Sequence, residues 1–177
     1  GVGRLVDIAR RHETRVLIKP TKFGEVFAKT GGLPVAKRAP ERQAYRLQEL
    51  ARWRDRLAIP IVIQPKHFPS DETAGTRLVV AAAVAGKDAV GLSREIGRAL
   101  WEREENIAEA GVLDAAAARA WIDAADLRRS AAPGAELDAI WAANTQEALG
   151  RGIFGAPSYR LGSGELFWGQ DRLEFLE

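Results

Sequence analysis

Apolar residues recur every three or four positions along most of the chain, which is the spacing of amphipathic helices. Pro40 fits the first turn of one long helix, because a proline there loses no intrahelical hydrogen bond. Ser70 or Asp71 can cap another. The pattern predicts helices over residues 1–12, 22–29, 40–57, 71–85, 88–103, 113–125 and 135–149.

Two regions have the pattern of strands instead of helices. Arg15–Lys19 is a short apolar run typical of a buried strand, and Pro20 ends it. Nearer the C-terminus, Gly162-Ser163-Gly164 lies between two apolar segments and supplies residues that tolerate the positive φ of a tight hairpin turn. Pro157 fits the start of the first hairpin strand, since proline cannot donate to a strand ladder.

Asp171 and Glu174 have the spacing of a capping box in front of the apolar pair Phe175 and Leu176. This pattern predicts a final helix with Asp171 at its N-cap. A helix N-terminus also attracts anions, because its first N–H groups have no partner within the helix. Asp171 therefore has two possible roles, as a structural N-cap and as part of a binding site.

Composition limits the class of protein. The chain has 177 residues, of which 46% are hydrophobic and 28% charged, so one globular domain with a possible subdomain is expected. The net charge of +2 is too small to indicate a nucleic-acid partner. No apolar run reaches the roughly 18 residues of a membrane span, and no signal-peptide pattern is present. We expect a cytoplasmic protein that does not enter membranes.

The residue types that are absent from this sequence limit the chemistry that it can perform. There is no cysteine, so they supply no thiolate for disulfide exchange. A thiol would have to be borrowed, and glutathione supplies one. There is also no methionine, even at position 1, which suggests that residues before Gly1 are missing. Only His12 and His67 could supply imidazole ligands, and no metal site is expected.

Four stretches resemble the 2-hydroxychromene-2-carboxylate isomerases, which are relatives of kappa-class glutathione transferases in the DsbA-like branch of thioredoxin folds: residues 27–45, 65–69, 143–149 and 152–177. The resemblance implies an α/β, thioredoxin-like fold with a large inserted all-helical domain. Residues 1–20 and 150–177 would form the thioredoxin-like domain, with its first strand expected before residue 1, and residues 21–149 the insertion. It also implies a cis peptide bond before Pro157.

The same resemblance implies a glutathione-dependent isomerase. Reversible addition of the glutathione thiolate would act on a small aromatic carboxylate in aromatic-compound catabolism, in a homodimer, with an activating serine expected before residue 1. A kappa-like transferase or peroxidase and a non-catalytic thioredoxin-like binding module are the alternatives. The chain departs from the family at Gly32, where the isomerases and kappa transferases have an asparagine.

The resemblance assigns glutathione to the C-terminal hairpin and the helix after it. Ala156 would pair through its main chain with the cysteinyl part, and Asp171 would meet the ammonium of the glutamyl part. Trp168 could instead pack within the hairpin. Pro157 could instead simply begin a strand. The expected glutathione-binding residues are Ala156, Pro157, Trp168, Gly169, Gln170 and Asp171.

Two residues of the middle segment are expected to bind substrate. Arg42 belongs to a basic cluster with Lys37 and Arg38, and the resemblance places it near a carboxylate, for which arginine is suited. A solvated helix face is the alternative. His67 has the pKa range of a base near neutral pH, and the alternative is an ordinary loop histidine.

Overall fold

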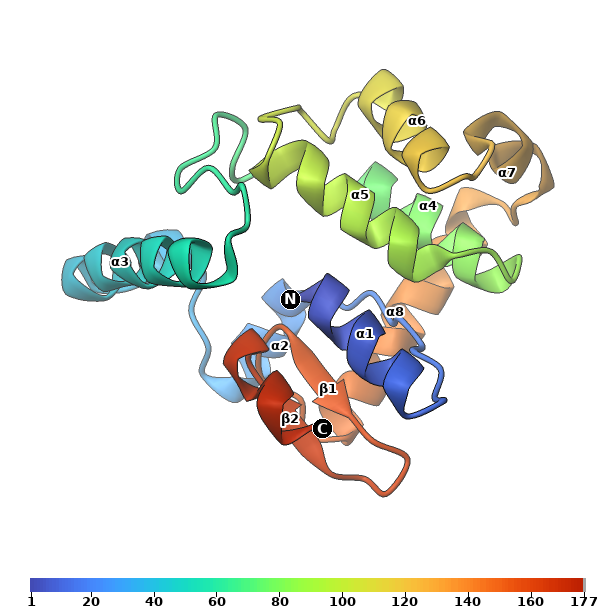
Figure 1. The fold of residues 1–177 in the computed structure, drawn as a ribbon. Helices are drawn as coiled ribbons and strands as arrows, with labels where there is room; N and C mark the ends of the chain where they lie inside the picture. Colours follow the sequence, from blue (N-terminus) through green and yellow to red (C-terminus); the bar gives the residue numbers. More distant parts are fainter. Residues whose placement is uncertain (177) are drawn as a thin grey trace. The chain divides into compact units, whose positions relative to one another are not determined.

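The computed structural model describes residues 1–176, which form two compact units (Figure 1). Among the described residues, one unit contains residues 1–33 and 138–176, and the other contains residues 34–137. The chain therefore leaves the first unit once and returns to it. Helix α8 (Gly134–Gly150) begins in the second unit and continues in the first.

The first unit is built on the predicted hairpin. Strands β1 (Ser158–Arg160) and β2 (Leu166–Trp168) pair antiparallel, with Ser158 opposite Trp168. The turn between them lies at the predicted glycines, and the N–H of Leu161 donates to the carbonyl of Glu165 at 3.0 Å. The unit also contains α1 (Val2–Arg11), α2 (Phe23–Thr30) and the 3₁₀ helix η2 (Gln170–Phe175).

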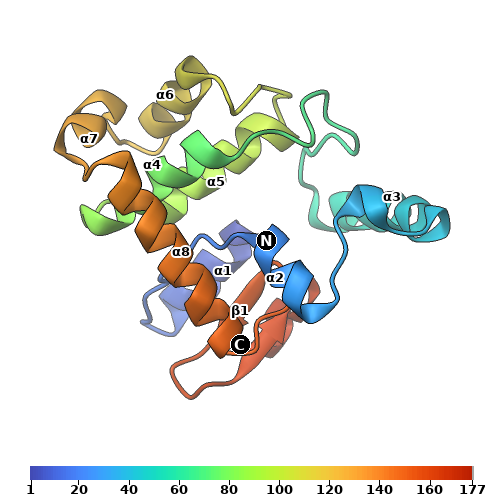
Figure 2. The ribbon, with the colours of Figure 1, turned by 180° about the vertical axis from the view of Figure 1, so that it is seen from behind.

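Helices flank this hairpin. Figure 1 shows α1 beside β1 of the hairpin, and Figure 2 shows α8 in front. Thr145 of α8 is fully buried and accepts a hydrogen bond from the N–H of Lys22 at 3.0 Å. Val26 of α2 is buried too. These contacts explain why α2 and the end of α8 belong to the first unit, whereas the sequence placed residues 21–149 together in the insertion.

The predicted strand Arg15–Lys19 is not a strand. In the described part of the chain, the only sheet is the pair of β1 and β2, and no residue of 15–19 joins a ladder. The segment still alternates, with Val16 and Ile18 half-buried and Leu17 65% exposed. The apolar run gives alternating burial, but a strand also requires a hydrogen-bonded neighbour, which sequence periodicity does not supply.

The core of the second unit lies among four helices. α4 (Thr73–Val84) packs on α5 (Ala89–Trp101) and on α7 (Ala124–Ser130), and α5 packs on α6 (Ala110–Arg119). Their buried residues include Leu78, Val80, Leu92, Ala99, Leu113 and Leu127. Within residues 1–176, no helix has both the length and the apolar character needed to cross a bilayer.

Helix α3 (Pro40–Leu57) has the bounds that the sequence predicts, and it differs from the other helices of its unit. None of its residues is buried, and its apolar side chains are only half-covered. The short 3₁₀ helix η1 (Val35–Lys37) precedes it. Both views show α3 standing apart from α4–α7 (Figures 1 and 2).

The predicted helix 113–125 is wrong, because α6 and α7 are separate helices. α6 ends at Arg119, and Trp121 has a left-handed φ of 59°. The N–H of Ile122 then donates to the carbonyl of Ala117 at 2.9 Å, which closes the end of the helix. Asp123 starts α7 by accepting from the N–H of Asp126 at 2.9 Å.

Candidate functional site

The loop before β1 has an exposed main chain held in a defined shape. The Ala156–Pro157 peptide bond is cis, as the resemblance implied. The Ser158 hydroxyl donates to the carbonyl of Gly155 at 2.7 Å, and the N–H of Gly169 donates to the carbonyl of Pro157 at 2.9 Å. Ala156 and Pro157 are themselves exposed. The loop is thus tied at both ends while its middle faces solvent.

Trp168 forms one wall of this loop. It ends β2 opposite Ser158, and its ring meets that of Phe154 edge to face, with 4.9 Å between centroids. A β-carbon at Gly155 would lie 2.3 Å from the indole Nε1, so only glycine leaves room for the ring. Trp168 is nevertheless 52% exposed. It therefore packs within the hairpin and also presents an aromatic surface beside Ala156.

Asp171 is not the helix cap that the sequence predicts. The N-cap of η2 is Gly169, with φ of 107°, and no side chain caps this short 3₁₀ helix. Asp171 lies in the first turn, and its Oδ1 would be 2.3 Å from a β-carbon at position 169. The left-handed glycine explains the shift by two residues, because it lets the chain turn and leaves space for the carboxylate.

Gln170 carries a polar atom that the fold does not satisfy. Its Oε1 is buried and has no hydrogen-bond partner in the described chain. The N–H and C=O of Ala156 likewise make no hydrogen bond within residues 1–176. A buried acceptor without a partner is costly, so a ligand that donates an N–H there gains affinity. The main chain of Ala156 thus offers one donor and one acceptor to an extended ligand.

Tyr159 was not predicted as a site residue. It lies in β1 two residues after Pro157, half-buried, with its side chain in the field of Arg4 and Asp171. Burial raises the pKa of its phenol, Arg4 opposes this rise, and Asp171 adds to it. The phenol is therefore a hydrogen-bond donor at neutral pH. Only its position after Pro157 could have marked it in the sequence.

Arg42 and His67 belong to the second unit, apart in sequence from the other predicted site residues. Arg42 is exposed in the first turn of α3, and within residues 1–176 it makes no ion pair. His67 is half-buried in a loop whose Phe68–Pro69 bond is also cis. Among the described residues, no three His, Asp or Glu side chains are grouped to hold a metal ion. Substrate binding by Arg42 and His67 stays a prediction.

Comparisons with known proteins agree with this fold. The family model described as the DSBA-like thioredoxin domain matches residues 2–177. No curated protein matches the sequence. Among solved structures, that of a selenomethionine 2-hydroxychromene-2-carboxylate isomerase is similar, with a TM-score of 0.77, 20% identity, and coverage of 99% of this chain and 84% of that chain. The predicted thioredoxin-like fold is confirmed, and the chain belongs to the DsbA-like thioredoxin domain family.

Proposed function

We propose that this protein is a glutathione-dependent isomerase of the 2-hydroxychromene-2-carboxylate type, with glutathione as a regenerated cofactor. The observation that carries the proposal is the buried, unpartnered Oε1 of Gln170, the residue that follows Gly169, whose N–H donates to the carbonyl of Pro157. The fold, which the chain shares with an isomerase of this type, supports the same activity. The lack of cysteine in the sequence supports a borrowed thiol.

Each residue of the site has a proposed role in binding. The N–H and C=O of Ala156 pair with the main chain of the cysteinyl residue of glutathione. The Gln170 oxygen accepts a hydrogen bond from the glutamyl end, whose ammonium the Asp171 carboxylate attracts. Trp168 and Phe154, whose rings contact each other, offer an apolar surface to the ligand. Bound glutathione supplies the thiolate that adds reversibly to the unsaturated substrate.

The cellular location follows from this proposal. Glutathione keeps thiols reduced in the cytosol, so we propose a cytoplasmic protein. The homodimer stays a prediction.

The first test is glutathione dependence. The absorbance of 2-hydroxychromene-2-carboxylate is followed with the protein, with and without glutathione. Turnover only in the presence of glutathione, with no net consumption of it, is the expected result. Turnover that is equal without glutathione contradicts the mechanism, and no turnover on this substrate under either condition contradicts the isomerase.

The second test addresses the site itself. Gln170→Leu keeps the shape but removes the buried acceptor, so glutathione affinity should fall roughly tenfold while the stability of the unliganded protein stays equal or rises. Gln146→Leu, on the exposed side of α8, is the matched control. Affinity is read from the rise in melting temperature with glutathione concentration. Equal glutathione affinities of Gln170→Leu and Gln146→Leu would show that Gln170 does not bind glutathione.

A kappa-like transferase or peroxidase, which would use the same thiolate, is the second candidate. A β-carbon at Gly32 would lie 2.3 Å from the Phe27 ring, so the ring occupies the space that the family's asparagine side chain needs. Since the isomerases and the kappa transferases both have that asparagine, Gly32 favours neither of them, and the activity assays must separate the two. Activity on chlorodinitrobenzene or a hydroperoxide, with none on the chromene, selects this candidate. Glutathione binding without any of these activities selects the binding module.

A further inference from the structure

One residue of the second unit has a strained backbone that its own segment does not explain. Glu104 has a left-handed φ of 54°, although it is not a glycine, and it is exposed. This conformation is uncommon for a residue with a β-carbon, and strain of this kind is often found at functional sites. Glu104 follows the end of α5 and belongs to no helix or strand. The reason for the strain must therefore lie in its contacts.

The residues on either side of Glu104 are fixed to α5. The guanidinium of Arg103 donates to the carbonyl of Glu95 at 3.2 Å and to the carboxylate of Glu105 at 2.9 Å. It also forms an ion pair with the carboxylate of Glu95, which is buried, at 3.8 Å. The N–H of Glu105 donates to the carbonyl of Ala99 at 2.8 Å. These contacts hold the chain on both sides of Glu104 and can thus maintain its strained φ.

The side chain of Glu104 holds a loop that is distant in the sequence. Its Oε1 accepts a hydrogen bond from the N–H of Lys66 at 3.0 Å, across 38 residues. The N–H of Phe68 donates to the carbonyl of Pro65 at 3.1 Å, so residues 65–68 form a turn that contains His67. Glu104 is therefore bonded to the residue directly before His67.

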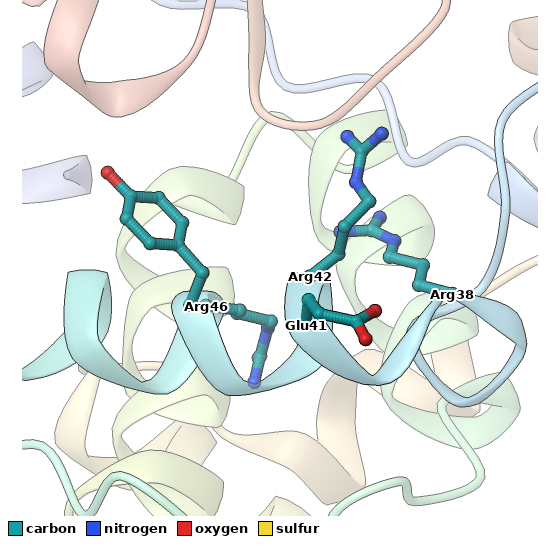
Figure 3. A pocket seen from close by; sticks show the side chains of 5 residues that line it. Arg38, Glu41, Arg42 and Arg46 are labelled. Carbon is teal, nitrogen blue, oxygen red and sulfur yellow. The ribbon is translucent and has the colours of Figure 1, made fainter.

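The same turn reaches the depression that Arg42 lines. Figure 3 shows this depression at the start of α3, with Arg42 and Arg46 among the residues that line it. The guanidinium of Arg46 lies 5.5 Å from the ring centroid of Phe68 and 5.8 Å from that of Trp101. These two rings contact each other, with 4.8 Å between centroids. Phe68 thus joins the turn of His67 to the helix that carries Arg42.

We propose that Glu104 is a positioning residue, which holds the turn of residues 65–68 so that the His67 imidazole binds the substrate. This inference rests on the proposed isomerase and on the predicted role of His67 in it. A turn that is not held must be ordered when the substrate binds, and the entropy of ordering weakens binding. Loss of the hydrogen bond from Lys66 should therefore raise KM and change kcat little.

The test measures the isomerisation of 2-hydroxychromene-2-carboxylate at saturating glutathione. Glu104→Gly tolerates the left-handed φ but removes the carboxylate, so KM should rise about three- to tenfold while kcat and stability in urea do not fall. Glu104→Gln keeps an acceptor oxygen and should retain the wild-type KM. Glu13→Gly is the matched control and should leave KM unchanged, because Glu13 is also exposed and left-handed, with φ of 49°, but lies outside this loop.

A double-mutant cycle separates the positioning of His67 from a purely structural role. In a His67→Ala protein, Glu104→Gly should no longer raise KM, because its effect acts through the imidazole. An equal rise in both proteins, or no rise in either, overturns the inference and leaves the isomerase in place. An absence of turnover by the wild type overturns the proposed isomerase, and this inference with it.

Discussion

The indole Nε1 of Trp168 occupies the space above Gly155 so closely that a β-carbon at position 155 would lie only 2.3 Å from it. Gly155 is buried, and its carbonyl accepts from the Ser158 hydroxyl at 2.7 Å. The tryptophan and the glycine therefore fix the loop of Ala156 and Pro157 together. Any residue with a β-carbon at position 155 would displace the Trp168 ring, so the two residues depend on each other.

Gly155→Ala should displace Trp168 and disturb the proposed glutathione site. Overpacking of this kind costs about 1–3 kcal/mol of folding free energy. We expect a lower denaturant midpoint and a weaker effect of glutathione on the melting temperature. Gly162→Ala is the control, because nothing lies within 4 Å of a β-carbon there. A Gly155→Ala protein with unchanged stability and unchanged glutathione binding would contradict the importance of this contact.

Much of the secondary structure could be predicted, because local signals determine it. Pro40 begins α3, and the regular spacing of apolar residues extends that helix to Leu57, as the structure has it. The glycines at 162 and 164 determine the hairpin. One exception depends on a left-handed residue that is not glycine, whose φ the sequence does not reveal. Trp121 divides one predicted helix in this way.

Less of the site could be predicted, because its contacts join residues that are distant in the chain or depend on a single backbone angle. The resemblance placed Ala156 and Trp168 in one site. The hairpin register explains why they lie close together, since Trp168 is opposite Ser158, two residues after Ala156. The positive φ of Gly169 moved Asp171 out of the cap position. The contact of Arg46 with Phe68 and Trp101 requires the fold of the whole unit.

Thr145→Val should destabilise the first unit although it changes little volume. The buried Thr145 hydroxyl accepts from the N–H of Lys22 at 3.0 Å and donates to the carbonyl of Trp141 at 2.9 Å. Valine leaves that N–H without a partner, at a cost of about 1–3 kcal/mol. Urea unfolding measures the loss, and amide exchange at Lys22 should become faster.

The matched variant at this position is Thr145→Ser, which keeps the hydroxyl and loses a methyl group. Its loss should be the smaller of the two, about 0.5–1.5 kcal/mol by analogy with Ile→Val. The reverse order would show that methyl packing matters more here than the hydrogen bonds.

The N-cap of α7 should make stability depend on pH. The N–H of Asp126 donates to the Asp123 carboxylate and lowers its pKa. A carboxyl group whose pKa is lower in the folded state contributes stability above its unfolded pKa, about 3.9, and this contribution is lost as the pH falls through the folded value. Asp123→Ala should therefore lower the melting temperature at pH 7, with a difference that shrinks below about pH 4.

The comparison variant for this cap is Asp123→Asn, whose amide oxygen accepts the same bond but does not titrate. Its melting temperature at pH 7 should lie between those of the wild type and the alanine variant. A difference between wild type and Asp123→Ala that stays constant down to pH 2.5 would contradict the role of the carboxylate.

Trp121→Gly should stabilise the protein. Trp121 is 96% exposed, so its ring contributes almost no burial, and its φ of 59° is unfavourable for a residue with a β-carbon. Its N–H donates to the carbonyl of Ala118 at 3.0 Å in the turn that ends α6, a position where glycine is preferred. Glycine removes the left-handed cost of about 1–2 kcal/mol but loses more chain entropy on folding, so the free energy of unfolding in urea should rise by up to about 1 kcal/mol.

Trp121→Ala keeps the β-carbon and should give no gain, so the pair of variants separates backbone strain from loss of the ring. A stabilised alanine variant, or a destabilised glycine variant, would show that the indole itself or the rigidity of the chain determines stability at this turn.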